Sequence, residues 1–320
     1  KKLKMQTKIK QLTNWILILV FLPLLLSCAN PNIIKHTITG KALGTYYTIH
    51  YYASENFELS KEEIQLKIDS LLSDFNKTAS IYDSTSIISK FNTNKDFETN
   101  EMFNEIFLRS IEISELTSGA FDISVGNLVN AWGFGNKEFS SPEDKLIDSL
   151  LQFIGRDKLK FVNAKPSKTM PETKIDMNGI AKGYSVDLVS VLFEKLGIKS
   201  YIVEIGGEIR VGMTKPEQKP WIVAVEKPSK DAVSEQEIQR KVYIANSALA
   251  TSGNYRRYYE IDGKRFSHTI DPKTGKPVSH NLLSATVIAK DCMTADALAT
   301  AFMVMGHEAA LEFCKKHKDI

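Results

Sequence analysis

Residues 175–189 read IDMNGIAKGYSVDLV and bring a carboxylate, two glycines and a lysine close together in the chain. From Ala181 onward, apolar residues recur at helical spacing as far as Gly197, so this part predicts a helix that ends at the glycine. The residues before it, Lys174 to Met177, predict the end of a strand. The segment NGIAKG is therefore expected to be a strand-to-helix turn, in a chain that alternates the two kinds of element.

The chemistry of this turn allows two interpretations. Backbone N–H groups at a helix start are unpaired and the helix dipole there favours anions, so a phosphate group fits. Lys182 precedes Gly183, whereas a Walker loop needs Gly-Lys-Ser/Thr, so the pattern is not a Walker loop. Because short glycine turns also serve packing alone, phosphate binding and a purely structural turn both remain open.

Upstream of this turn, the chain predicts strands and then helices. Residues 36–52 are rich in Thr, Tyr and Ile and predict two strands around a glycine turn. A helix should begin after Ser60, which is a good N-cap and forms a capping box with Glu63. A second helix is expected over residues 100–117, with Gly119 as its stop.

The remaining segments complete a prediction of an α+β fold. Residues 136–168 predict helix and loop, and residues 170–290 predict mainly strands interrupted by one helix. An Asp262-Gly263 turn between two alternating segments predicts a hairpin. We expect mixed sheets flanked by helices, in a single compact, two-lobed domain that covers residues 36–320.

The composition places the chain among globular proteins. Of its 320 residues, 43% are hydrophobic and 25% are charged, which excludes a disordered or fibrous protein. The net charge is +3, and much of this excess lies in the N-terminal stretch KKLKMQTKIK. The remainder is close to neutral, so the sequence shows no electrostatic footprint of nucleic-acid binding.

The N-terminus predicts an export signal with a lipid anchor. The apolar run WILILVFLPLLLS is too short and too interrupted by proline to span a membrane comfortably. The residues LLSC that end at Cys28 resemble a bacterial lipobox, in which the cysteine is lipidated. We expect a signal peptide over residues 1–27, lipidation at Cys28, a short tether over residues 28–35, and anchoring to a membrane of the bacterial cell envelope, facing the periplasm. The alternative is an ordinary signal peptide with a chance cysteine.

Two more cysteines follow, Cys292 and Cys314, without the close spacing of metal ligands. We expect both to be small buried residues with a structural role. One disulfide between them is the alternative.

The stretch DCMTADALATAFMVMG contains a candidate metal site. If Thr294 caps this last helix, Asp296 lies in its first turn and Thr300 lies one turn later on the same face. Hard oxygen ligands of this kind suit Mg²⁺, which takes few protein ligands. The structural alternative is that the acid favours a helix N-terminus and the threonine bonds to its own helix.

Two further stretches hold candidate site residues. In FSHTIDPKTGKPV, His268 precedes a turn that begins at Asp271, where it could transfer a proton or serve only a structural role. In SGAFDISVGNLVNAWGFG, glycines and aromatic residues alternate around Asp122. Such aromatic residues can stack on a flat ring or pack in a core.

Taken together, these stretches resemble the ApbE-type FAD:protein FMN transferases over about residues 36–310. The matching motifs, in the family's order, are ALGTYYTI, SGAFDISVGNLVNAWGFG, KIDMNGIAKGYSVD, EIGGEIRVG, ATSGNYRRYYEIDGKRFSHTIDPKTGKPV and ADALATAFMVMG. The resemblance implies Mg²⁺-dependent transfer of FMN from FAD to a Thr or Ser hydroxyl of an acceptor protein, with release of AMP. It also implies that the protein is a lipoprotein, and that the acceptor is a subunit of a membrane redox complex.

The resemblance assigns roles to particular residues. The metal ligands would be the carbonyl of Ala181 and the side chains of Asp296 and Thr300, with the glycines of NGIAKG letting the backbone bend toward the ion. Lys182 would neutralise pyrophosphate charge and His268 would accept the proton of the attacking hydroxyl. FAD would contact Leu43, Tyr82, Gly119, Ala120, Phe121, Asp122, Asp176, Lys182, His268 and Ile270.

Two features depart from the family pattern, and two other functions remain open. Leu43 stands where the family usually has Met, which has a similar apolar volume. The family continues into a closing strand pair beyond the position of Ile320, so either the chain is truncated there or the sheet edge is finished differently.

The alternative functions are an FAD pyrophosphatase that yields FMN and AMP, and a lipoprotein that binds FAD without chemistry.

Overall fold

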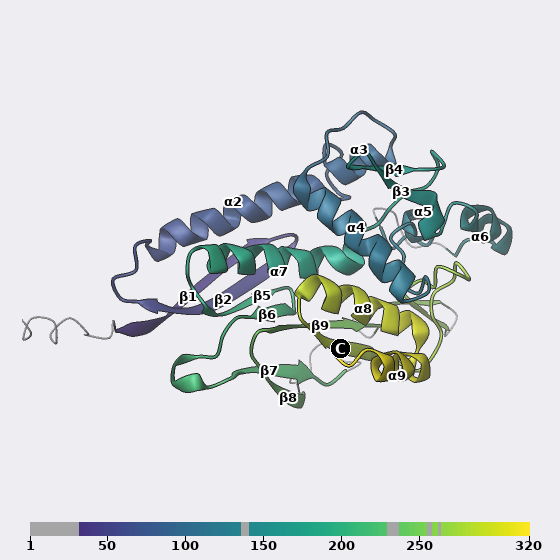
Figure 1. Ribbon diagram of the computed structural model, residues 1–320. Coiled ribbons are helices and arrows are strands. Elements are labelled where there is room, and N and C mark those ends of the chain that lie inside the picture. Colours follow the sequence, from purple (N-terminus) through teal and green to yellow (C-terminus); the bar gives the residue numbers. More distant parts are fainter. Residues whose placement is uncertain (1–31, 136–140, 229–236, 255–257, 262–263) are drawn as a thin grey trace, which may run out of the picture.

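The computed structural model describes residues 32–135, 141–228, 237–254, 258–261 and 264–320 (Figure 1). The predicted signal peptide, Cys28 and the Asp262-Gly263 turn lie outside these residues. The α-helices are α2 (Lys61–Ala79), α3 (Ile87–Asn92), α4 (Glu101–Leu116), α5 (Gly126–Ala131), α6 (Asp144–Leu151), α7 (Asn178–Lys195), α8 (Cys292–Met305) and α9 (His307–Lys316). Two short 3₁₀ turns are η1 (Arg156–Lys158) and η2 (Pro216–Gln218). Within the described residues, no helix is long and apolar enough to cross a membrane.

The strands form one large sheet and three hairpins. They are β1 (Ile33–Ala42), β2 (Thr45–Ser54), β3 (Leu159–Val162), β4 (Lys165–Lys168), β5 (Ser200–Ile205), β6 (Glu208–Val211), β7 (Trp221–Glu226), β8 (Ile238–Ile244), β9 (Ser247–Gly253), β10 (Tyr258–Ile261), β11 (Lys264–Ser267) and β12 (Ser284–Ala289). The six-stranded sheet has the order β1-β2-β5-β6-β9-β12, and its neighbouring strands are antiparallel. The predicted hairpin at 258–267 is confirmed as the pair β10–β11.

Two tight turns lie at the same end of this sheet. Leu43-Gly44 joins β1 to β2 and Gly206-Gly207 joins β5 to β6, and all of these residues have positive φ angles. Two-residue turns with positive φ match the twist of antiparallel strands. Leu43, at φ 53°, is a bulky residue in the left-handed region, which costs on the order of 1 kcal/mol. The predicted pair of strands around a glycine turn is confirmed.

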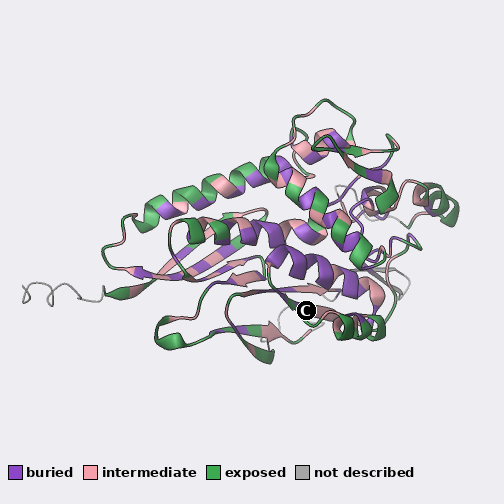
Figure 2. Cartoon of the chain, in the orientation of Figure 1, coloured by how far each residue is buried: buried purple, intermediate pink, exposed green. Residues whose placement is uncertain are grey.

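Helices cover one face of the sheet and a hairpin covers the other, which confirms the predicted α+β fold (Figure 1). Helices α2 and α7 bury Ile68 and Phe193 against Ile49 and Val203 of the sheet. The hairpin β7–β8 packs Trp221 and its neighbours against the opposite face. Figure 2 shows that α8 is buried along most of its length, between the sheet and the outer helices.

Helices α7 and α8 approach each other closely because α7 has glycines at the contact. A Cβ atom on Gly183 would overlap the carbonyl oxygen of Cys292, and one on Gly179 would lie 3.1 Å from Thr300 Oγ1. The prediction that NGIAKG is a turn is therefore wrong. These residues form the first turns of α7 itself, and the glycines permit helix packing rather than a bend of the backbone.

Asp187 fixes the start of α8 from the side of α7. Its carboxylate accepts the N–H groups of Cys292 at 2.9 Å and of Met293 at 2.8 Å. Arg210 donates to the same carboxylate at 2.8 Å. Since a helix start leaves such N–H groups without partners in the helix, this carboxylate satisfies two of them and sets the position of α8 relative to α7.

Replacing Gly183 by Ala should destabilise the fold more than replacing Gly179 by Ala. In a helix Ala is favoured over Gly by about 1 kcal/mol, but overpacking typically costs about 1–3 kcal/mol. We expect a net loss of unfolding free energy for Gly183→Ala and a smaller change for Gly179→Ala, measured by urea denaturation. Equal stability of the two variants would contradict the close helix contact.

Several other expectations are decided by the structure. The capping box of Ser60 and Glu63 is confirmed. Asn100 caps α4, and this helix ends just before Gly119, as predicted. The helix that was predicted to begin near Thr294 is α8, and Thr294 does not cap it. It begins at Cys292, and Asp291 Oδ1 accepts the N–H of Thr294 at 2.8 Å.

Two segments contain more regular structure than the sequence predicted. Residues 141–168, the described part of the predicted 136–168 segment, hold the expected helix α6 but also the hairpin β3–β4, whose turn is Asn163-Ala164. A further helix, α9, follows α8. Cys292 and Cys314 are both free, so the alternative of a disulfide between them is wrong. Cys292 is fully buried, as expected, whereas Cys314 is only partly buried, because it lies on the outer helix α9.

Candidate active site

Three charged side chains meet where α7 passes the end of the sheet. Lys182 Nζ of α7 lies 2.9 Å from Glu208 Oε1, at the start of β6. Asp296 of α8 accepts the N–H of Gly183 at 2.9 Å through Oδ2. The side chain of Lys182 is 41% exposed and that of Glu208 only 5%. Lys182 is therefore accessible to solvent, and to a ligand from solvent, whereas the carboxylate with which it pairs is buried.

Negative charge exceeds positive charge in this cluster. Burial and, to a smaller extent, the nearby Asp296 raise the pKa of Glu208 to about 7, while Lys182 opposes the shift. Burial also raises the pKa of Asp296, against the effects of Lys182 and of the Gly183 N–H. Two buried carboxylates beside one ammonium would be stabilised by an added cation.

The predicted metal ligands fit this need for a cation. Asp296 and Thr300 project from α8, and Thr300 Oγ1 lies 3.2 Å from Ser252 Oγ. Ala181 lies in α7 between Gly179 and Gly183, two positions at which α7 lies close to α8. Carboxylate, hydroxyl and carbonyl oxygens are the ligand types that Mg²⁺ prefers.

The described residues include no group of three or more His, Cys, Asp or Glu side chains that could hold a metal ion. The predicted ligand set is of another kind, because it has only one carboxylate. Mg²⁺ commonly uses few protein ligands and completes its shell with water and phosphate oxygens.

The segment around Asp122 lies against the start of α7. Asp122 Oδ1 accepts the N–H and the hydroxyl of Ser124, and the N–H of Asp176 donates to the carbonyl of Ile123 at 2.7 Å. Burial raises the pKa of both carboxyls. The side chain of Phe121 is 4% exposed and contributes to the core.

Ala120 and Gly119, two other predicted FAD contacts in this segment, differ from each other in their surroundings. Ala120 is also buried, at 7% exposure, so its side chain serves the core. Gly119, at φ 79°, ends the turn after α4, and a Cβ atom there would lie 4.0 Å from Lys273 Cε. The turn that follows Asp271 therefore adjoins the Asp122 segment.

The His268 segment is attached to the end of β9. Thr269 Oγ1 donates to Asn254 Oδ1 at 2.8 Å. Asn254 follows β9, which also carries Ser252, the neighbour of Thr300. His268 is half-buried, while Ile270 is buried in a small cluster with Leu128, Trp132 and Ile147. These contacts bring the segment to the same end of the sheet as the charged cluster.

Leu43 and Tyr82 are the two remaining predicted site residues, and only the turn that contains Leu43 lies near Lys182 in the described part of the chain. The Leu43-Gly44 turn adjoins Thr45, and a Cβ atom on Gly206 would lie 3.0 Å from Thr45 and 3.3 Å from Lys182 Cδ. Tyr82 is 68% exposed, and within the described part of the chain its hydrogen bond is to Ser80 rather than to the cluster.

Sequence reasoning missed Glu208 and Asp187. Glu208 follows a double glycine in the matching motif EIGGEIRVG, and an acid at this place in a motif was a signal that the sequence offered. Asp187 gave no such signal, because its partners Cys292 and Met293 are remote in the chain.

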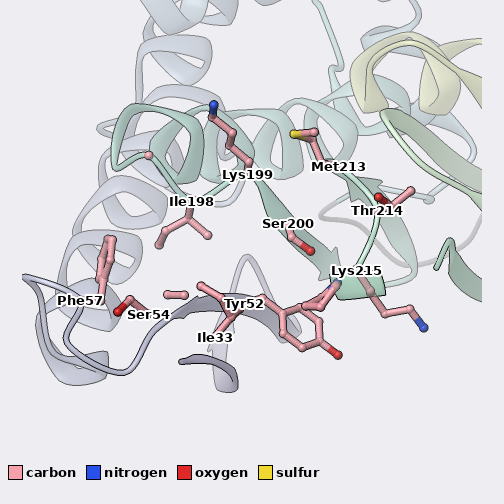
Figure 3. Close-up of a pocket in the computed structure, with 13 residues that line it drawn as sticks. Ile33, Tyr52, Ser54, Phe57, Ile198, Lys199, Ser200, Met213, Thr214 and Lys215 are labelled. Carbon is pink, nitrogen blue, oxygen red and sulfur yellow. The ribbon is translucent and has the colours of Figure 1, made fainter. Parts of the chain in front are cut away.

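A surface pocket of about 410 Å³ lies elsewhere (Figure 3). It is lined by apolar residues such as Tyr52, Ile198 and Met213, and by Lys215. Tyr52 lies near the end of β2 that is far from Leu43. None of the predicted site residues lines this pocket, so it is separate from the candidate site.

Fold and site together define an α+β protein in which a lysine pairs with a buried glutamate beside a second buried carboxylate. The chain belongs to the ApbE family, whose model matches residues 43–320. It is 40% identical over 303 residues to the FAD:protein FMN transferase of Vibrio cholerae, covering 93% of this chain and 89% of that protein. The Escherichia coli K12 protein of the same name is 36% identical, with 87% and 81% covered.

Solved structures agree with this family assignment. The flavin transferase ApbE from Vibrio cholerae superposes with a TM-score of 0.79 at 37% identity, covering 89% of this chain and 92% of that one. The apo form of the Pseudomonas stutzeri flavinyl transferase ApbE also gives 0.79, at 33% identity and with 89% of each chain covered. The predicted family and fold class are therefore confirmed.

Proposed function

We propose that this protein transfers FMN from FAD to a Thr or Ser hydroxyl of an acceptor protein and releases AMP. The family assignment supports flavin transfer as the reaction class. The observation that carries the proposal is the meeting of Lys182, Glu208 and Asp296 where α7 and α8 touch. A lysine with buried carboxylates suits a substrate with two linked phosphates and a divalent cation.

The reaction exchanges one phosphorus–oxygen bond for another. The acceptor oxygen bonds to the phosphorus of the FMN half, and the bond from that phosphorus to the bridging oxygen breaks, so AMP leaves with that oxygen. The hydroxyl proton goes to His268, which acts as general base. Lys182 neutralises charge on the phosphate oxygens and aligns them.

A magnesium ion would be held by Asp296, Thr300 and the carbonyl of Ala181. When bound, it supplies charge neutralisation at the phosphates. We also propose that FAD lies along Leu43, Tyr82, the main chain of the Gly119 to Asp122 segment, Asp176, Lys182 and the His268 to Ile270 segment. Because Ala120 and Phe121 are buried in the core, their part in FAD binding would fall to their backbone atoms.

The function is tested by incubating the protein with FAD, Mg²⁺ and candidate membrane redox subunits, followed by a denaturing gel viewed for flavin fluorescence. A fluorescent acceptor band that disappears when its acceptor Thr or Ser is replaced by Ala supports transfer. Release of AMP and free FMN without a labelled band would instead identify an FAD pyrophosphatase. Bound FAD that stays intact would identify a binding protein.

Location is a separate proposal, because Cys28 lies outside the described residues. We infer that Cys28 is lipidated and anchors the protein to a membrane of the bacterial envelope, facing the periplasm. Replacing Cys28 by Ser should release the protein from the membrane fraction and leave its activity unchanged, since the lipid is only a tether. Fractionation after a high-salt wash checks this, and a variant that stays with the membranes would refute lipidation at Cys28.

A further inference from the structure

We propose that Glu208 is a positioning residue of the flavin-transfer site: it holds the ammonium group of Lys182 in place for the substrate phosphates and adds the negative charge that favours a divalent cation there. This inference rests on the proposed function. It concerns a residue that the motif comparison left without a role.

The contacts of Glu208 are those expected of a residue that fixes the position of the Lys182 ammonium group. Its Oε1 accepts from Lys182 Nζ at 2.9 Å, and the residue is 4% exposed. Its Oε2 is buried and has no hydrogen-bond partner in the part of the chain that the structure describes. Since a buried carboxylate oxygen without a partner is unfavourable, this atom indicates that the occupied site supplies a donor or a cation.

The turn before Glu208 confines the stem of Lys182. Gly206 and Gly207 both have positive φ angles, and a Cβ atom on Gly206 would lie 3.3 Å from Lys182 Cδ. A lysine side chain is otherwise flexible, and fixing it costs entropy. The turn and the ion pair together hold Lys182 before substrate binds, which is the arrangement that makes an active site effective.

The two carboxylates come from different elements. Glu208 lies on β6 and Asp296 on α8, and each is buried near Lys182. Lys182 can balance only one of these charges. Removing the charge of Glu208 should therefore weaken the attraction for a cation and also release Lys182.

The test compares Glu208→Gln with Glu194→Gln. Glu194 lies on the same helix as Lys182 but outside the site, where it accepts from Tyr201 and Arg210. A nearby opposite charge typically changes ionic equilibria by about 10- to 1000-fold. We expect Glu208→Gln to raise the Mg²⁺ concentration for half-maximal FAD binding by about tenfold or more, measured by flavin fluorescence. Glu194→Gln should leave it unchanged.

Two further variants separate positioning from general stability. Glu208→Asp keeps the charge and should recover most of the Mg²⁺ dependence. The melting temperature of Glu208→Gln should not fall, because the substitution removes a buried charge and leaves the ammonium of Lys182, whose side chain is 41% exposed, in contact with solvent. At saturating Mg²⁺, where the attraction for the cation no longer limits binding, Glu208→Gln should cause little further loss of FAD affinity in a Lys182→Met background. Fully additive losses at saturating Mg²⁺, or a wild-type Mg²⁺ dependence in Glu208→Gln, would overturn the proposal.

These binding measurements need no acceptor protein. If the wild type binds FAD with Mg²⁺ but transfers no flavin, the proposed function fails, and the comparison of variants still decides the role of Glu208. If the wild type binds no FAD, both proposals are wrong.

Discussion

Replacing Asp296 by Asn is expected to reduce flavin transfer at physiological Mg²⁺ by about a thousandfold. The substitution keeps the size of the side chain, and its amide oxygen can still accept from Gly183 N–H, which the carboxylate now does at 2.9 Å. It removes the negative charge that a divalent cation requires. Loss of metal-assisted charge stabilisation is typically worth several kcal/mol, and each 1.4 kcal/mol is about tenfold in rate.

The measurement is the rate of covalent flavin incorporation over a series of Mg²⁺ concentrations. Asp74→Asn is the matched control, because Asp74 lies on α2, where its carboxylate forms an ion pair with the exposed Lys77. High Mg²⁺ should restore part of the activity of Asp296→Asn. Unchanged transfer at limiting Mg²⁺ would remove Asp296 from the site.

Replacing His268 by Ala is expected to slow flavin transfer by about 10²- to 10⁴-fold, the usual contribution of a general base. A hydroxyl has a very high pKa, so its attack on phosphorus requires a proton acceptor. FAD affinity should change little, because the proton moves only as the transition state forms. The segment that carries His268 is held at the site by the bond from Thr269 to Asn254.

This prediction needs paired measurements at saturating Mg²⁺: FAD binding by fluorescence quenching and single-turnover flavin transfer. His307→Ala, at the exposed start of α9, is the matched control. Weakened binding with a normal single-turnover rate at saturating FAD would exclude His268 as the base. Lys182 and the metal would then be the main catalytic elements.

The elements that could be predicted from sequence are those set by local signals. The capping box of Ser60 and Glu63 and the glycine that ends α7 act over a few residues, so they can be read directly. The hairpin β3–β4 was missed because its second strand, KPSK, is polar and contains a proline. The cap of α8 was misplaced by a few residues because Asp291 and Thr294 are both good N-caps.

The candidate site depends on contacts that local patterns do not contain. Lys182 and Glu208 are 26 residues apart, and Asp187 lies 105 residues before Cys292. The glycines of α7 looked like turn residues because their purpose depends on α8, which follows much later in the chain. The family resemblance pointed to this motif. The reason that glycine is needed at positions 179 and 183 is the close packing of α7 on α8, which leaves little room for a larger side chain.

The central claim is most directly tested by the intact mass of an acceptor protein after incubation with FAD, Mg²⁺ and this enzyme, together with the amount of AMP released. The account predicts that the acceptor gains the mass of FMN less one water, and that one AMP appears for each modified acceptor. An acceptor of unchanged mass, with AMP and free FMN accumulating in equal amounts, would contradict it.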